Sequence, residues 1–211
     1  SGPATAVSLS APRGVAVDAS GTVYIADSSR NCVRKVVGAT FSHVLGGGAT
    51  TTCNATGAAT AASLSAPNDV AVDGAGTVYV ADTGRNCVRK VVGTTFSHVL
   101  GGGGTTACTS TGAATAASLS APDGVAVDMS GRLLVVDRGR RCVRSVNGTT
   151  YSLAALTGTN SSIGDDGPAV SATMRTPSNV AVTASGDVLV TDRATTSGSS
   201  KIRSIVGPWP L

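Results

Sequence analysis

The stretch LSAPRGVAVDASGTVYIADSSRNCVRKVVG, residues 9–38, decides the fold because the chain repeats it. Copies begin again at Leu64, at Leu119 and, with more changes, at Met174. The anchor prolines of the four copies are spaced 55 residues apart: Pro12, Pro67, Pro122 and Pro177. A fixed period of this length is typical of propellers and solenoids, whose units bury their faces against each other. We therefore predict one domain, residues 1–211, with repeat units at approximately 9–63, 64–118, 119–173 and 174–211.

The composition indicates an all-β protein that is not strongly charged. The chain contains no Glu and no Gln, and is rich in Val, Thr, Ser, Ala and Gly, so most strong helix formers are missing. The net charge of +4 is a mild excess, well below that of a nucleic-acid-binding tail. No apolar run is long enough to cross a membrane, so we expect no membrane insertion.

Each repeat unit contains the pattern of four short strands. In the first unit the β-branched runs are residues 14–18, 22–27, 32–37 and 40–45, separated by glycine-containing turns. Four antiparallel strands form one blade of a β-propeller. The linkers between units are long. For residues 58–62 the sequence is compatible with a short helical turn and with an extended polar segment.

The fourth unit differs at its end. After the expected strand at residues 201–206 the chain reads Gly-Pro-Trp-Pro-Leu, and proline cannot donate to a sheet ladder. We therefore expect blade four to lack its outer strand.

The residues PRGVAVDASGTVYIADSSRNCVRKV, 12–36, resemble the NHL repeat, and the complete unit is similar to long-linker NHL repeats. The elements P-x-x-V-A-V-D, D-x-x-G and V-Y-[IV]-A-D recur at matching offsets, and the resemblance covers essentially the whole chain. It implies an all-β propeller of four NHL-type blades. NHL propellers commonly have about six blades, so whether these four close into a ring stays open. The fold hosts binding modules, scaffolds and enzymes alike, and by itself names no function.

The five cysteines occupy two repeated positions, one before the third strand and one in the linker. Next-blade pairing gives Cys53–Cys87 and Cys108–Cys142 and leaves Cys32 over, either for a bond to another chain or as a free buried thiol. Pairing within one unit gives Cys32–Cys53 and Cys87–Cys108 instead. We favour the first scheme, because the third linker and the fourth unit lose both members of such a pair together, at Ile163 and Lys201.

The cysteine pattern favours an oxidising compartment, and N-glycosylation sequons favour the secretory route. The sequons begin at Asn54, Asn147 and Asn160, all in expected loops or turns. We therefore expect an extracellular or cell-surface protein that carries glycans.

The two positions after each anchor proline are expected at the mouth of the central channel. Four oxygen-bearing side chains there are weak candidates for a metal site: Asn68, Asp69, Asp123 and Asn179. Asn68-Asp69 also resembles a pair in metal-dependent gluconolactonase-like propellers, but those enzymes use a Glu as well, and this chain has none. The bland alternative is that these side chains satisfy nearby backbone groups. His43 and His98 are expected on outer strands, too far out to complete a catalytic site.

An arginine group precedes the third strand of the first three units and forms a possible binding face: Arg30, Arg85, Arg140 and Arg141. Some NHL propellers bind RNA through a basic face, but aromatic residues for base stacking are nearly absent here. Solvated or Asp-paired arginines are the simpler reading. The regular aspartates that end the second strand, such as Asp27, suit a role in the turn.

Taken together, the sequence predicts a non-enzymatic, extracellular interaction or structural module without a cofactor. The left-over cysteine and the unfinished blade favour protein partners, including head-to-tail self-association into a glycosylated surface or filament. A metal-dependent lactonase- or lyase-like propeller enzyme is the first alternative, and an RNA-binding NHL domain is the second.

Overall fold

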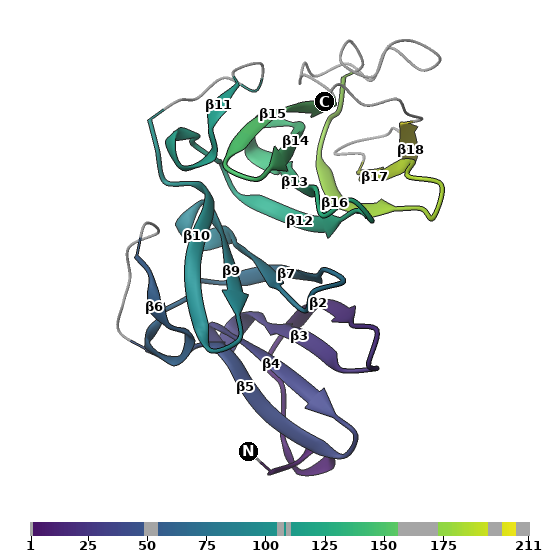
Figure 1. The fold of residues 1–211 in the computed structure, drawn as a ribbon. Coiled ribbons are helices and arrows are strands. Elements are labelled where there is room, and N and C mark those ends of the chain that lie inside the picture. The colour runs from purple at the N-terminus through teal and green to yellow at the C-terminus, as the bar shows by residue number, and fades with distance from the viewer. Residues whose placement is uncertain are drawn as a thin grey trace.

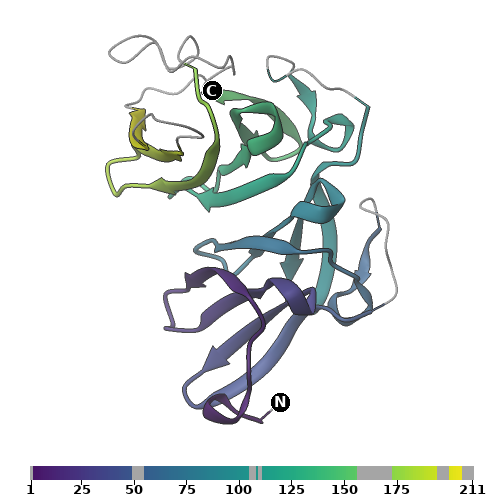
Figure 2. The same ribbon diagram turned by 180° about the vertical axis from the view of Figure 1, so that it is seen from behind.

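A computed structural model describes residues 2–48, 55–104, 108, 111–155, 173–193 and 200–205 of this chain. The strands form four antiparallel sheets that follow one another along an arc, here called blades one to four from the N-terminus (Figures 1 and 2). Within the described residues there is no α-helix, and the helical segments are single 3₁₀ turns. The expected all-β propeller of four blades is confirmed.

The first three blades share one topology, in which the chain runs outward from an inner strand. The order is β1-β5-β4-β3-β2 in blade one, β6-β10-β9-β8-β7 in blade two and β11-β15-β14-β13-β12 in blade three. Blade one consists of β1 (Gly2–Pro3), β2 (Pro12–Val17), β3 (Val23–Asp27), β4 (Cys32–Val37) and β5 (Thr40–Gly46). Blade two consists of β6 (Gly57–Ala58), β7 (Pro67–Val72), β8 (Val78–Asp82), β9 (Cys87–Val92) and β10 (Thr95–Gly101). Blade three consists of β11 (Gly112–Ala113), β12 (Pro122–Val127), β13 (Leu133–Asp137), β14 (Cys142–Asn147) and β15 (Thr150–Ala155).

Short 3₁₀ turns stand at two equivalent places in these blades. One follows the edge strand, as η1 (Ala4–Ala6), η3 (Ala59–Ala61) and η5 (Ala114–Ala116). The other separates the second and third long strands, as η2 (Ser28–Arg30), η4 (Thr83–Arg85) and η6 (Arg138–Arg140). The helical turn considered for residues 58–62 is therefore present as η3.

The linkers supply a fifth, two-residue strand to each of the first three blades, beyond the four long strands expected from the sequence. Gly57 and Ala58 of β6 pair with Phe96 and Thr95 of β10, at the outer edge of blade two. The linker that leaves blade one thus joins the sheet of blade two before the chain turns inward to β7. As a result, blades two and three each begin inside the preceding sequence repeat.

Blade four has three strands within the described residues, in the order β16-β17-β18. They are β16 (Pro177–Val182), β17 (Val188–Asp192) and β18 (Lys201–Ile205). Residues 207–211, on which the expectation of a missing outer strand rests, lie outside the described residues.

The apolar cores lie between successive blades. Because side chains alternate across a strand, each sheet has two faces, and each face meets a different neighbour. Ala26 and Val33 of blade one share a buried cluster with Val70, Val78 and Val80 of blade two. Equivalent clusters join blades two and three, and blades three and four. The inner strands β2, β7, β12 and β16 also contact one another in that order.

None of the helices in the described part of the chain has the length and apolar character needed to cross a membrane.

Candidate functional site

A polar hollow of about 310 Å³ lies where the inner strands begin, and it holds the predicted channel-mouth residues. The four weak metal-ligand candidates all line it: Asn68, Asp69, Asp123 and Asn179. Arg13 of blade one and Arg193 of blade four line it as well. The repeat spacing therefore identified correctly which side chains meet at this mouth.

Asp69 is a bridge between the inner strands of blades two and three. Its Oδ1 accepts the backbone N–H of Val70 at 2.9 Å, and its Oδ2 accepts that of Val125, in blade three, at 2.9 Å. The pKa of this carboxyl is raised to about 6, mainly by burial; the backbone N–H groups of Val125 and Val70 oppose the rise, and the charge of Asp123 makes a smaller contribution to it. Oδ2 therefore joins β7 to β12, while Oδ1 is held by the backbone of its own strand.

The other mouth residues are engaged in similar ways. The amide Nδ2 of Asn68 donates a short hydrogen bond to Oδ1 of Asp123, whose Oδ2 lies 3.5 Å from Nε of Arg138. Oδ1 of Asn179 accepts the backbone N–H of Val180 at 2.8 Å. The oxygens of Asp69, Asp123 and Asn179 that a cation would need thus already face N–H groups of the protein. This arrangement fits the alternative interpretation, in which the polar side chains accept hydrogen bonds from nearby backbone groups, better than it fits a metal site.

Glycine at position 14 allows blades one and two to approach closely at the mouth. A Cβ on Gly14 would lie 2.5 Å from Cα of Asp69 and would also collide with its carboxylate. Gly124 stands in the same relation to Asn179, whose Cα would be 2.7 Å from an added Cβ. The mouth is therefore a packed junction of inner strands.

An ion pair with a buried aspartate joins the middle strands of every blade. In chain order these pairs are Arg34–Asp27, Arg89–Asp82, Arg144–Asp137 and Arg203–Asp192, with Nε to Oδ2 distances of 2.9, 3.0, 3.1 and 3.2 Å. The side chains of Arg89 and Arg144 are fully buried. Sequence reasoning missed these pairs and gave the aspartates a turn role. The constant spacing between Asp27 and Arg34, repeated in the next two units, was the signal that could have found them.

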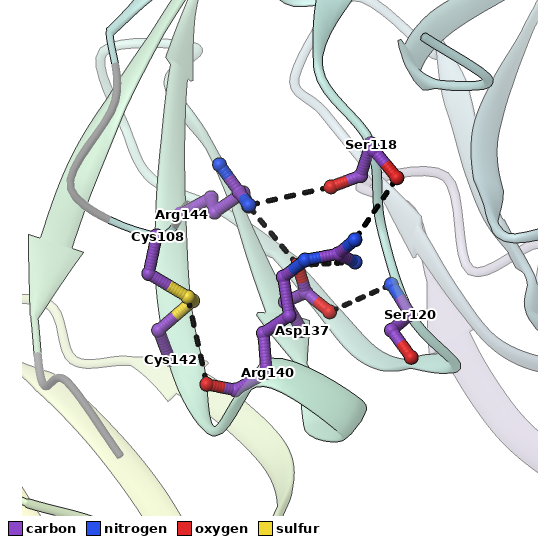
Figure 3. The surroundings of a disulfide bond; sticks show 7 residues. All are labelled: Cys108, Ser118, Ser120, Asp137, Arg140, Cys142 and Arg144. Atoms are coloured by element: carbon purple, nitrogen blue, oxygen red, sulfur yellow. Dashed lines mark hydrogen bonds and ion pairs between the residues drawn. A yellow bond between two sulfur atoms is a disulfide. The ribbon is translucent and has the colours of Figure 1, made fainter. Parts of the chain in front are cut away.

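Most of the predicted arginine face belongs to the same networks. Arg140 lies 3.7 Å from Oδ2 of Asp137 and donates to Oγ of Ser118 at 3.0 Å (Figure 3). Arg85 makes the equivalent contacts with Asp82 and Ser63, and Arg30 makes them with Asp27 and Ser8. Arg141 is the left-handed residue that ends η6, with φ of 59°. Three of these four arginines therefore tie the incoming linker to the end of the second long strand.

Cys108 is bonded to Cys142, which is the pair that next-blade pairing predicts (Figure 3). The bond pins the linker between blades two and three to the start of β14. Cys87 is also disulfide-bonded, and its predicted partner Cys53 lies outside the described residues. Cys32 is a free, buried thiol, and burial raises its pKa.

Of the three sequons, only that of Asn147 falls on described residues. Asn147 ends β14, is exposed, and is followed by Gly148 in the hairpin turn to β15. Asn54 and Asn160 lie outside the described part of the chain. The histidines are on the outer strands, as expected: His43 on β5 and His98 on β10.

The two ends of the arc differ sharply from its interior in exposure. On the inner strands the equivalent residues Val70, Val125 and Val180 are 3%, 4% and 6% exposed, because the preceding blade covers them. Val15, at the same position of blade one, is 65% exposed, and Val17 beside it is 59% exposed.

Blade four shows the opposite face. Its Ile202 is 73% exposed, whereas Val33, Val88 and Val143 at the equivalent position are completely buried against the following blade. Among the described residues, no sheet covers the outward face of β2 or of blade four. The described part of the molecule is therefore an open arc.

These blades, stacked through alternating apolar faces around inner strands, define the class as a β-propeller. The family model described as the NHL repeat matches residues 9–36 and 64–91. Blades one and two thus contain NHL repeats, and the four sheets together are the blades of a β-propeller. No curated protein matches the chain in sequence.

Solved structures share the fold at low sequence identity. A structural genomics protein of unknown function from Bacteroides thetaiotaomicron superposes with a TM-score of 0.67 and 18% identity, covering 85% of this chain and 44% of its own. A streptogramin B lyase gives 0.58 and 11%, covering 96% and 56%. A putative gluconolactonase gives 0.57 and 15%, covering 94% and 64%. This chain thus spans only 44% to 64% of the length of these structures, and at such identities the likeness shows the fold alone.

Proposed function

We propose that this protein is a non-enzymatic, extracellular β-propeller that serves as a protein-interaction or structural module. In this proposal copies of the chain associate head to tail and build a glycosylated surface or filament. The observation that carries it is the exposure of Val15 and Val17: the equivalents of Val15 in the other blades are buried by a neighbouring blade, and those of Val17 are partly buried. An apolar sheet face of this kind is a typical site of protein association.

The hydrogen bonds and ion pairs of the channel-mouth side chains support an interaction role over catalysis. General acid–base or metal chemistry needs groups that are available to a substrate or ion. Here both oxygens of Asp69 accept backbone N–H groups, and Asp123 is held between Asn68 and Arg138. Two of these contacts, Val125 to Asp69 and Asn68 to Asp123, connect blades two and three, which is a structural role.

Two features support the extracellular setting. Disulfides persist in oxidising compartments, and the bond between Cys108 and Cys142 closes a loop with a sequence separation of 34. The sequon at Asn147 stands in an exposed hairpin turn, where a glycan would point into solvent.

The arginine contacts support protein partners over RNA. Phosphate recognition depends on Lys and Arg side chains that are free to reach the backbone of the nucleic acid. Arg30, Arg85 and Arg140 are instead ion-paired to buried aspartates and bonded to linker serines. We therefore propose no nucleic-acid partner.

Light scattering coupled to size exclusion, at several concentrations and without reductant, tests the proposal. The expected result is a mass that rises with concentration above the 20.5 kDa of one chain. A single 20.5 kDa species at every concentration would contradict self-association.

A further inference from the structure

Two faces of the molecule repeat the two halves of an interface that already exists inside the chain. The leading face of a blade, which meets the blade before it, consists in blade four of Val180, Val182, Val188, Val190 and Ile205. According to the strand registers, the structurally equivalent residues of blade one are Val15, Val17, Val23, Ile25 and Val36. The leading face of blade one is thus an all-aliphatic copy of a face that blade three covers.

The trailing face, which meets the blade after it, is repeated as well. In blade three it consists of Ala126, Leu134, Val136, Val143 and Ser145, of which Ala126, Leu134, Val136 and Val143 belong to the cluster shared with blade four. The structurally equivalent residues of blade four are Ala181, Leu189, Thr191, Ile202 and Ser204. Three of the five positions keep the same residue, and the only polar replacement is Thr191 for Val136.

The two free faces are therefore complementary, because each repeats one half of the interface between blades three and four. The residues named above are uncharged on both faces. Arg34, which lies beside Ile25 on the leading face, is ion-paired with Asp27 at 2.9 Å, so no unpaired charge would be buried between the faces. The leading face of blade one is also free of the preceding-blade contacts that cover its counterparts, as the exposure of Val15 shows.

We infer that a second copy of this chain docks the trailing face of its blade four onto the leading face of blade one. This inference rests on the proposed function and gives it a specific interface. The contact is heterologous, because two different surfaces meet, and each added copy again offers one free face of each kind. The arc of blades is thereby continued from one molecule into the next.

Two variants that disable one face each test the inference. Val15→Lys places a charge in the leading face, and Ile202→Lys places one in the trailing face. Burying an unpaired ammonium group weakens an apolar contact by on the order of 100-fold. Both positions are exposed in the single chain, so circular dichroism and thermal unfolding should match those of the wild type. Val92→Lys, at a residue that is 57% exposed outside both faces, is the matched control.

Light scattering of each variant and of their mixture gives the decisive result. Each variant alone is expected to stay a single chain at concentrations where wild type and Val92→Lys assemble, since one face of every contact is disabled. An equimolar mixture is expected to form a dimer of one chain of each kind, joined by the intact faces, and to stop there.

Other results would overturn the inference while leaving the proposed function standing. Assembly of Val15→Lys at the wild-type concentration would show that the leading face is not used. Loss of assembly in one variant only, without a dimer in the mixture, would indicate a contact between identical surfaces. A wild type that never assembles would contradict the proposed self-association itself.

Discussion

At the scale of single residues, the arginines that run through the blades are the least expected feature. Arg144 is completely buried, pairs with Asp137 and lies over the ring of Tyr151 at 5.2 Å. Taking both charges out of water is costly, and the pair is tolerable because each charge has its partner. Arg34 holds the same place in blade one, but its side chain is 22% exposed because no blade precedes it in the described structure.

Because the two arginines differ in burial, the same substitution should lower the free energy of unfolding by different amounts at the two positions. Arg144→Met removes the nearer of the two arginines paired with the buried Asp137, leaves only Arg140 at 3.7 Å, and should lower the free energy of unfolding by about 3 kcal/mol. Arg34→Met should cost clearly less, because water reaches Asp27 once that side chain is shortened. Urea denaturation of both variants measures this, and equal losses would contradict the account.

The carboxyl of Asp69 should make stability depend on pH. Its pKa is raised from 3.8 to about 6 in the folded protein, so the folded state holds the proton more tightly than the unfolded chain. Its contribution is fully present below the unfolded pKa and is lost as pH rises through 6, a change of about 3 kcal/mol. The Asp69→Asn variant cannot ionise there and should lack this change.

Urea denaturation of wild type and Asp69→Asn between about pH 4 and pH 7 isolates the effect, since the other carboxyls are common to both proteins. The stability of the variant relative to wild type is expected to increase with pH. A difference that stays constant over this range would show that Asp69 titrates normally.

At the scale of elements, the contact between inner strands depends on small residues at the mouth. Gly14→Ala should destabilise the protein by about 1–3 kcal/mol, because the added methyl group meets the backbone of Asp69 in β7. Gly74→Ala is the matched control, since a Cβ there meets no atom within 4 Å. Thermal unfolding compares the two variants. A Gly14→Ala protein as stable as the control would mean that β2 and β7 are not packed this closely.

The sequence revealed the long strands well and the smaller elements poorly. The 55-residue period and the alternation of Val with smaller or polar residues located the four long strands of the first unit and the last described strand of the fourth to within about two residues. The edge strands were not predictable, because Gly57-Ala58 has no alternation, and its pairing depends on where the linker runs in space. A charged residue alternating with valine usually marks a solvent-facing position, so Arg89 and Arg144 did not read as buried.

The sequence predicted which residues line the candidate site, but not the hydrogen bonds that those residues make. Spacing alone brought Asn68, Asp69, Asp123 and Asn179 to one mouth, because equivalent positions of a propeller converge at its axis. Which atoms those side chains engage depends on the distance between blades. The coordinates were needed to show the carboxylate of Asp69 reaching the backbone of Val125.

At the scale of the whole molecule, the blades stabilise one another through three similar interfaces and leave one half-interface free at each end of the described arc. Nearest-neighbour stacking of this kind lets an assembly grow by repeating a contact that the chain already makes. The free faces at Val15 and Ile202 thus connect the fold to the proposed assembly.

The central claim is that the leading face of blade one is open in the single chain and covered in the assembly. The rate at which a maleimide alkylates a Val15→Cys variant, measured over a range of protein concentrations, tests it most directly. A Val70→Cys variant, at the level position that is 3% exposed, is the reference and should react slowly throughout. The account predicts rapid reaction of the Val15→Cys variant in dilute solution and slowing as concentration rises. Reaction as slow as the reference in dilute solution, or equally fast at all concentrations, would contradict it.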